Sequence, residues 1–90
     1  MTHTIQGKRK LLNRVRRIKG QVEAVERALQ EEKGCTNILH LVAVIRGATS
    51  GLMAEVMEDH IRHHITDPSH ESDIPQATEE LIDAIRSYLC

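Results

Sequence analysis

Apolar residues recur in the first third of the chain at alternating intervals of four and three positions. The stripe consists of Leu11, Val15, Ile18, Val22, Val25 and Leu29. This spacing puts apolar side chains on one face of a helix and is typical of helices that pack lengthwise. We predict a helix over about residues 5–31, and we expect Gly34, after a charged stretch, to be its stop signal.

A second apolar stripe with the same spacing follows Cys35. Its members are Ile38, Val42, Ile45, Thr49, Leu52 and Val56. The small residues from Gly47 to Gly51 could form a loop by composition. The apolar phase is nevertheless the same on both sides of them, so we predict one continuous helix over residues 36–65.

The remaining residues predict a short third helix. Residues 66–73 are polar and contain Pro68, so the second helix should end near Ile65. Apolar residues then recur at Ala77, Leu81 and Ile85. We therefore predict an all-α fold in a single domain over residues 1–90, a long antiparallel helical hairpin followed by a short C-terminal helix.

Composition indicates that this domain assembles with copies of itself. Ninety residues bury little surface, and the chain has no Phe, no Trp and one Tyr. Helices with aliphatic stripes gain the missing burial by oligomerising. The two cysteines form no disulfide framework, and we identify no signal peptide and no apolar run of membrane length. A reducing cytoplasm, without a membrane partner, is the expected setting.

Charge is distributed very unevenly along the chain. Residues 1–22 contain seven of the twelve Lys and Arg and no acid, whereas residues 23–90 hold all thirteen Asp and Glu. The formal net charge of −1 therefore combines +7 with −8. A basic segment on an acidic body points to a polyanionic partner.

The basic residues of the first helix suit a nucleic-acid backbone. Lys10, Arg14 and Arg17 recur at intervals of four and three beside the apolar stripe. The alternative is a merely solvated face, but such a face usually carries acids one turn away, and this segment has none. We predict DNA binding, with five candidate contacts: Lys10, Arg14, Arg16, Arg17 and Lys19.

The candidate metal ligands lie far apart along the second helix. Cys35 stands at its head, and His60, His63 and His64 stand near its far end. At ~1.5 Å per residue, Cys35 and His60 would be ~38 Å apart, too far to share an ion within one chain. Two such helices packed antiparallel would bring Cys35 of one protomer to His60 and His64 of the other.

The geometry of the hairpin adds a fourth ligand. With a turn near residues 32–35, His3 would fall beside His60 and His64 of its own chain. His60 and His64 share one helical face, whereas His63 points about 100° from His64. Each of these residues alone is more often structural or solvated, and only their convergence favours a site. Three imidazoles and a thiolate suit Ni(II) and Co(II), with Zn(II) as a third candidate.

Several motifs cover nearly the whole chain: residues 12–22 (LNRVRRIKGQV), Cys35, residues 45–48 (IRGA), residues 51–56 (GLMAEV) and residues 59–60 (DH). Together they resemble the CsoR/RcnR family of small helical bacterial repressors, which respond to metals or formaldehyde. The resemblance implies dimers that assemble into tetramers, with a metal site across the dimer interface. It also implies that the metal-free protein holds a G/C-rich operator through its basic face.

The ligand set distinguishes branches of that family. His3, Cys35, His60 and His64 match the nickel/cobalt-sensing branch (RcnR-like and DmeR-like), which implies control of a cation-efflux gene. Copper sensors have a second Cys where this chain has His64. The sequence does not choose between nickel and cobalt.

Rival functions stay open at this stage. Formaldehyde-responsive, FrmR-like members also use the Cys, and the run at residues 14–18 resembles them, although they have Pro where this chain has Thr2. A cytoplasmic metal buffer would bind metal but not DNA. We do not expect an enzyme, because no nucleophile–base pair is evident and a filled ligand set leaves no open metal position.

Overall fold

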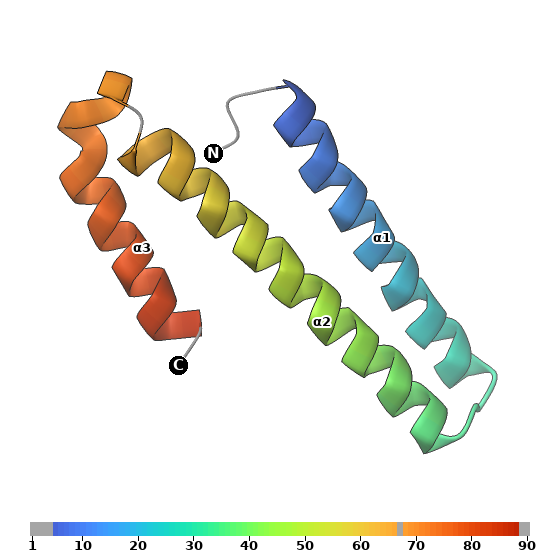
Figure 1. Ribbon diagram of the computed structural model, residues 1–90. Helices are drawn as coiled ribbons and strands as arrows, with labels where there is room; N and C mark the ends of the chain where they lie inside the picture. Colours follow the sequence, from blue (N-terminus) through green and yellow to red (C-terminus); the bar gives the residue numbers. More distant parts are fainter. Residues whose placement is uncertain (1–4, 67, 89–90) are drawn as a thin grey trace.

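The computed structural model describes residues 5–66 and 68–88, which are almost entirely helical (Figure 1). Helix α1 comprises Ile5–Gln30, and helix α2 comprises Cys35–His60. Helix α2 continues into a π-helical turn at Ile61–Ile65, and a 3-10 turn at Pro68–Asp73 leads into helix α3, Ile74–Tyr88. These ranges contain no strand, so the predicted all-α fold is confirmed.

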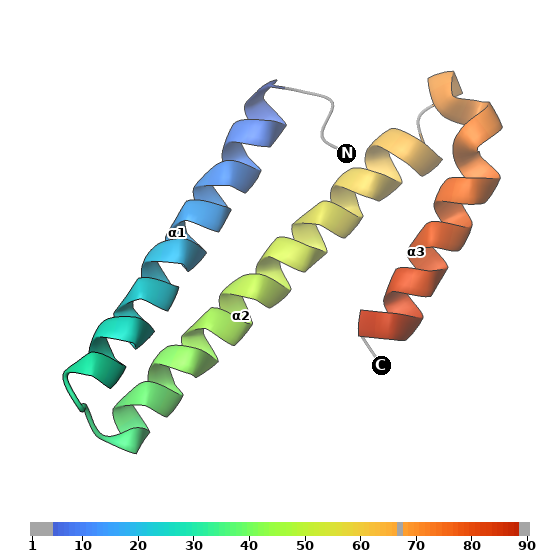
Figure 2. The same ribbon diagram turned by 180° about the vertical axis from the view of Figure 1, so that it is seen from behind.

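Helix α2 is the middle helix of the protomer. Helix α1 runs antiparallel along it, and α3 packs near the C-terminal end of α2 on its other edge (Figures 1 and 2). The Cα atoms span 54 × 31 × 13 Å, and among the described residues α1 and α3 each contact α2 but not each other. The described helices therefore form a single layer.

One layer leaves the apolar stripes only partly covered. Among the side chains that the structure describes, only Ala28 and Ala77 are buried, whereas Val15, Val22 and Val42 stay about half exposed. The radius of gyration is 17.0 Å, against about 12 Å for a compact chain of this length. The stripes predicted from spacing therefore lack a second layer of helices to cover them.

The turn between α1 and α2 differs from its expected form. Glu32 takes the left-handed conformation, with φ 54°, and the Lys33 N–H donates to the Ala28 carbonyl at 2.9 Å. Together these features end α1 as a Schellman motif. Gly34, expected to stop α1, instead has extended backbone and caps the start of α2. The turn thereby places Cys35 as the first residue of α2.

Helix α2 is continuous through its small residues, so the alternative of a loop at residues 47–51 is wrong. The Thr49 hydroxyl lies 3.0 Å from the carbonyl oxygens of Ile45 and Arg46, inside the helix. The helical run ends near Ile65, as predicted, but its last turn is π rather than α: the Thr66 N–H donates to the Ile61 carbonyl at 2.9 Å.

The run Cys35–Ile65 is long and apolar enough to cross a membrane, by length and composition alone. By that measure the expectation of no apolar run of membrane length is wrong. One such helix is weak evidence for a membrane span, because a helix buried in a soluble assembly passes the same test.

Candidate functional site

His60 and His64 lie together where α2 widens into the π turn. Their ring centroids are 5.1 Å apart, and the rings are tilted by 35°. His60 is the last residue of the α-helical part, and His64 belongs to the π turn. Single π turns inside α-helices are frequent at functional sites. The spacing of the two rings suits a pair of ligands to one ion.

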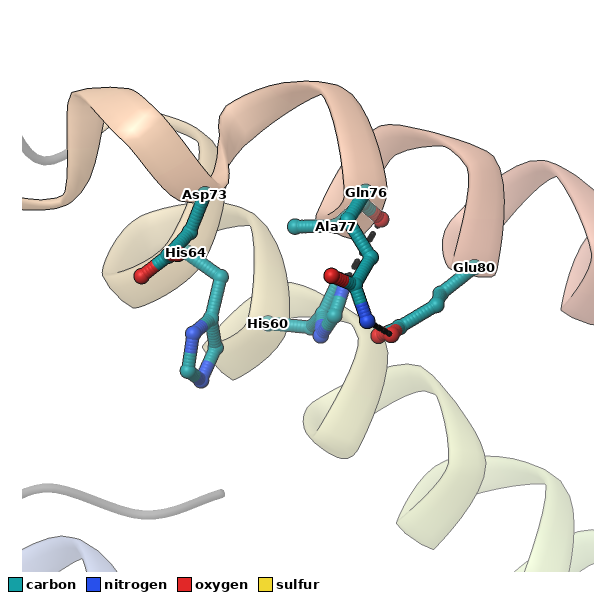
Figure 3. Close-up of a pocket in the computed structure, with 6 residues that line it drawn as sticks. All are labelled: His60, His64, Asp73, Gln76, Ala77 and Glu80. Carbon is teal, nitrogen blue, oxygen red and sulfur yellow. Dashed lines mark hydrogen bonds between the residues drawn. The ribbon is translucent and has the colours of Figure 1, made fainter.

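Helix α3 sets the orientation of the His60 ring. Its Nε2 lies 2.8 Å from the backbone oxygen of Ala77 (Figure 3). A carbonyl oxygen only accepts hydrogen bonds, so Nε2 carries the hydrogen and donates. In the neutral ring Nδ1 then keeps its lone pair for a metal. The small, buried side chain of Ala77 allows this close approach of α3 to α2.

An open pocket of about 360 Å³ lies between α3 and the end of α2. Its lining residues are His60, His64, Asp73, Gln76, Ala77 and Glu80 (Figure 3). The Gln76 amide donates to a Glu80 oxygen at 3.1 Å. The pocket therefore joins two imidazoles with two carboxylates. Sequence reasoning missed Asp73, Gln76 and Glu80, although their spacing of three and four residues marks one helical face.

Cys35 lies at the opposite end of α2 from the imidazole pair. Its thiol is exposed and forms no disulfide. The 25 residues that separate it from His60 correspond to about 38 Å of helix. Within the described ranges, no group of three His, Cys, Asp or Glu side chains is close enough to hold a metal ion. The described part of one protomer therefore brings together His60 and His64 but not Cys35.

The other histidines near this end have different positions. His3 lies outside the described residues. His63 is partly exposed, and its Nε2 lies 3.3 Å from an Asp59 oxygen one turn earlier in the helix. That contact is consistent with the expectation that His63 points away from the His60–His64 pair.

The five predicted DNA contacts occupy two faces of α1. Lys10, Arg14 and Arg17 share one face, whereas Arg16 and Lys19 lie about 140–200° around the helix from Arg14. The Arg16 guanidinium donates to Asn13 at 3.4 Å. A single phosphate backbone that follows the row of Lys10, Arg14 and Arg17, hereafter the basic row, would not reach the other two.

The basic row has an acidic partner that the sequence analysis did not anticipate. Glu55 of α2 accepts from Lys10 Nζ at 3.2 Å, and it also pairs with Nε of Arg14. Its side chain is 18% exposed, compared with 71% for Lys10 and 41% for Arg14. Residues 1–22 contain no acid, and Glu55 comes from the neighbouring helix. The register of the hairpin sets Lys10 beside Glu55, and the contact could have been predicted from that register.

Comparisons with known proteins agree with this architecture. A family model described as metal-sensitive transcriptional repressor matches residues 7–87. The transcriptional repressor RcnR of Citrobacter koseri is 39% identical over 89 residues, which cover 99% of each chain.

Two solved structures resemble this chain over almost its full length. One is a variant of the formaldehyde-responsive regulator FrmR from Salmonella enterica serovar Typhimurium, with a TM-score of 0.86 and 39% identity. That match covers 96% of this chain and 98% of the other. The other is the nickel-responsive transcriptional regulator InrS, with a TM-score of 0.73 and 32% identity over 96% and 93% of the two chains. The chain belongs to the CsoR/RcnR family of metal-sensitive transcriptional repressors.

Proposed function

We propose that this chain is a cytoplasmic repressor that binds operator DNA when metal-free and releases it when Ni(II) or Co(II) binds. Release derepresses a metal-efflux gene. Residues 1–90 act as one sensing and DNA-binding domain, and protomers form dimers that assemble into a homotetramer. The operator is G/C-rich, and its phosphates contact the basic segment of α1.

The observation that carries the proposal is the position of the soft and imidazole ligands at opposite ends of one rigid helix. Cys35 begins α2, and His60 ends it. An antiparallel pair of α2 helices would bring Cys35 of one protomer beside His60 and His64 of the other. The exposed residues of the apolar stripes supply a surface for that packing. We propose His3 as the fourth ligand.

The chemistry of the donors fits these ions. His60 is held with Nε2 donating to a carbonyl, which leaves Nδ1 as the donor atom to the metal. Imidazole suits Ni(II), Co(II) and Zn(II), and a thiolate adds softness. The exposed Cys35 thiol can supply that thiolate to a second protomer. A bound ion would cross-link the two protomers at this point.

The basic row lies at the same end of the hairpin as His60 and His64. Metal binding at these histidines would therefore act close to the residues that we propose bind DNA. Glu55, the partner of Lys10 and Arg14, precedes His60 by five residues, or about 7.5 Å along the helix. A displacement of this end of α2 therefore moves the carboxylate that contacts the row. A coupling free energy of about 1–3 kcal/mol is ordinary, and DNA must then weaken metal binding by the same factor.

The test is a DNA-binding titration against Ni(II), Co(II), Zn(II), Cu(I) and formaldehyde. The probe is a duplex that the wild-type protein selects from a random-sequence pool, so no operator needs to be assumed. We expect Ni(II) and Co(II) to dissociate the complex. If both leave it intact while formaldehyde dissociates it, the proposal is wrong. Tight metal binding without any DNA binding would instead identify a metal buffer.

A formaldehyde-responsive repressor is the second candidate, and the likeness to FrmR favours it. Formaldehyde would react at the exposed Cys35 thiol and would not need the imidazole pair. His64→Ala separates the two candidates. The variant should lose its response to Ni(II) and Co(II) under our proposal, whereas a formaldehyde sensor would keep its response to formaldehyde.

A further inference from the structure

We infer that Glu55 is a positioning residue for DNA binding: it holds the Arg14 guanidinium in the basic row so that its terminal nitrogens meet phosphate. This inference rests on the proposed function, because it assumes that the basic row faces DNA. Glu55 is negatively charged, so simple electrostatics alone would make it unfavourable for binding a polyanion such as DNA.

The contact between Glu55 and Arg14 leaves the terminal nitrogens for a ligand. The carboxylate pairs with Nε, the inner nitrogen of the guanidinium. The Nη2 nitrogen of Arg14 carries two further N–H donors, which suit the recognition of phosphate oxygens. At 41% exposure, part of the side chain remains open to such a partner.

Gly51 also contributes to the position of Arg14, and we call Glu55 and Gly51 together the seat of its guanidinium. It lies one helical turn before Glu55, and a Cβ at this position would stand 3.1 Å from Nη1 of Arg14. The Arg14 guanidinium is therefore held at Nε by the Glu55 carboxylate, and its Nη1 packs against the backbone of α2 at Gly51. An arginine ordered before binding loses less rotamer freedom when it meets phosphate.

The positioning role and simple charge neutralisation predict opposite signs. Glu55→Gln removes one negative charge from the DNA-binding end. If Glu55 only neutralised the row, the variant would bind DNA more tightly and with a steeper salt dependence. If Glu55 positions Arg14, the variant binds more weakly, and the slope of log K against log salt falls in magnitude by about 1, as for the loss of one phosphate contact.

The experiment measures binding of the selected duplex at several salt concentrations. Glu58→Gln is the matched control, because it removes the same charge from α2 at a residue that pairs only with Arg62 of its own helical run among the ion pairs found. We expect Glu55→Gln to weaken binding and Glu58→Gln not to. Unchanged or tighter binding by Glu55→Gln would overturn the inference.

Arg14→Ala separates this inference from the proposed function. If Arg14→Ala leaves DNA binding unchanged, the basic row does not face DNA and the proposed DNA face fails. If Arg14→Ala weakens binding, the loss caused by Glu55→Gln should disappear in the Arg14→Ala background. A loss that persists there would show that Glu55 does not act through Arg14.

Two glycine substitutions test the position of Arg14 without changing any charge, and they serve if Glu55→Gln does not fold. Gly51→Ala adds a methyl group against Nη1, whereas Gly47→Ala adds one where nothing lies within 4 Å. Both should favour the helix. We expect only Gly51→Ala to weaken DNA binding, and equal binding by the two variants would contradict the seat.

Discussion

The two ends of the helical hairpin have very different environments. At the closed end, a tight turn presents Cys35 as an exposed thiol. At the open end, the π turn and α3 form a pocket in which His60 is fixed by the Ala77 carbonyl. One end presents an exposed thiol, and the other presents an imidazole pair in which the ring of His60 is held by a hydrogen bond.

Under the proposed function, this difference explains why one protomer alone would not form a complete metal site. The imidazole pair has no thiol beside it, the Cys35 thiol has no imidazole beside it, and several residues of the apolar stripes between them remain about half exposed. An antiparallel second protomer would place its thiol beside the imidazole pair and its imidazole pair beside the thiol. A bound metal would then stabilise one particular packing of the two chains. A sensor needs such a difference between two states if metal binding is to change DNA binding.

The largest expected effect comes from removing the lone ligand of the closed end. Cys35→Ala should lower Co(II) affinity by more than about 100-fold, because losing an outer hydrogen-bond partner alone costs about 10–100-fold. The thiolate-to-Co(II) charge-transfer band should disappear, which absorption spectroscopy measures directly. DNA binding by the metal-free variant should match wild type. A persistent band would remove Cys35 from the site.

A smaller effect is expected from loosening the open end. Ala77→Leu puts a larger side chain where α3 meets His60, and it should break the 2.8 Å hydrogen bond that orients the ring. Co(II) affinity should fall by about 10-fold, and the free energy of unfolding should fall by about 1–3 kcal/mol.

Ser87→Leu, at an exposed position of the same helix, is the matched control for Ala77→Leu. It should keep near wild-type Co(II) affinity in competition titrations with a chelator. If the two variants bind Co(II) equally well, the carbonyl of Ala77 has no role in holding the ligand.

The smallest effect concerns the turn that presents Cys35. Glu32 adopts a left-handed conformation, which costs a non-glycine residue about 1–2 kcal/mol. Glu32→Gly should therefore raise the free energy of unfolding by about 1 kcal/mol in chemical denaturation, without changing metal affinity. Glu31→Gly, one residue earlier at ordinary φ, should not be stabilising, and an equal gain there would contradict the explanation.

The helices were predictable because their signals are local. The predicted bounds agree to within one residue with α1 and with the helical run formed by α2 and its π turn, and the constant phase across residues 47–51 correctly favoured a continuous helix. The π turn and the left-handed Glu32 were not predictable in this way. Both depend on backbone hydrogen bonds at helix ends, which residue spacing does not encode.

The site was predictable only in part, because much of it depends on contacts between helices. The pairing of His60 with His64 followed from their spacing. The carbonyl of Ala77 and the carboxylates of the pocket depend on how α3 folds back onto α2. Glu55 lies on a different helix from its basic partners, so a search along one helix could not find it.

The most direct test of the central claim mixes two defective chains. One carries Cys35→Ala, and the other carries both His60→Ala and His64→Ala, so neither forms a complete site alone. After co-refolding in equal amounts, random pairing into symmetric dimers should restore about one quarter of the wild-type Co(II)–thiolate absorbance, measured with a competing chelator. A site built across two chains predicts that recovery, and absorbance no greater than that of the separate variants would contradict it.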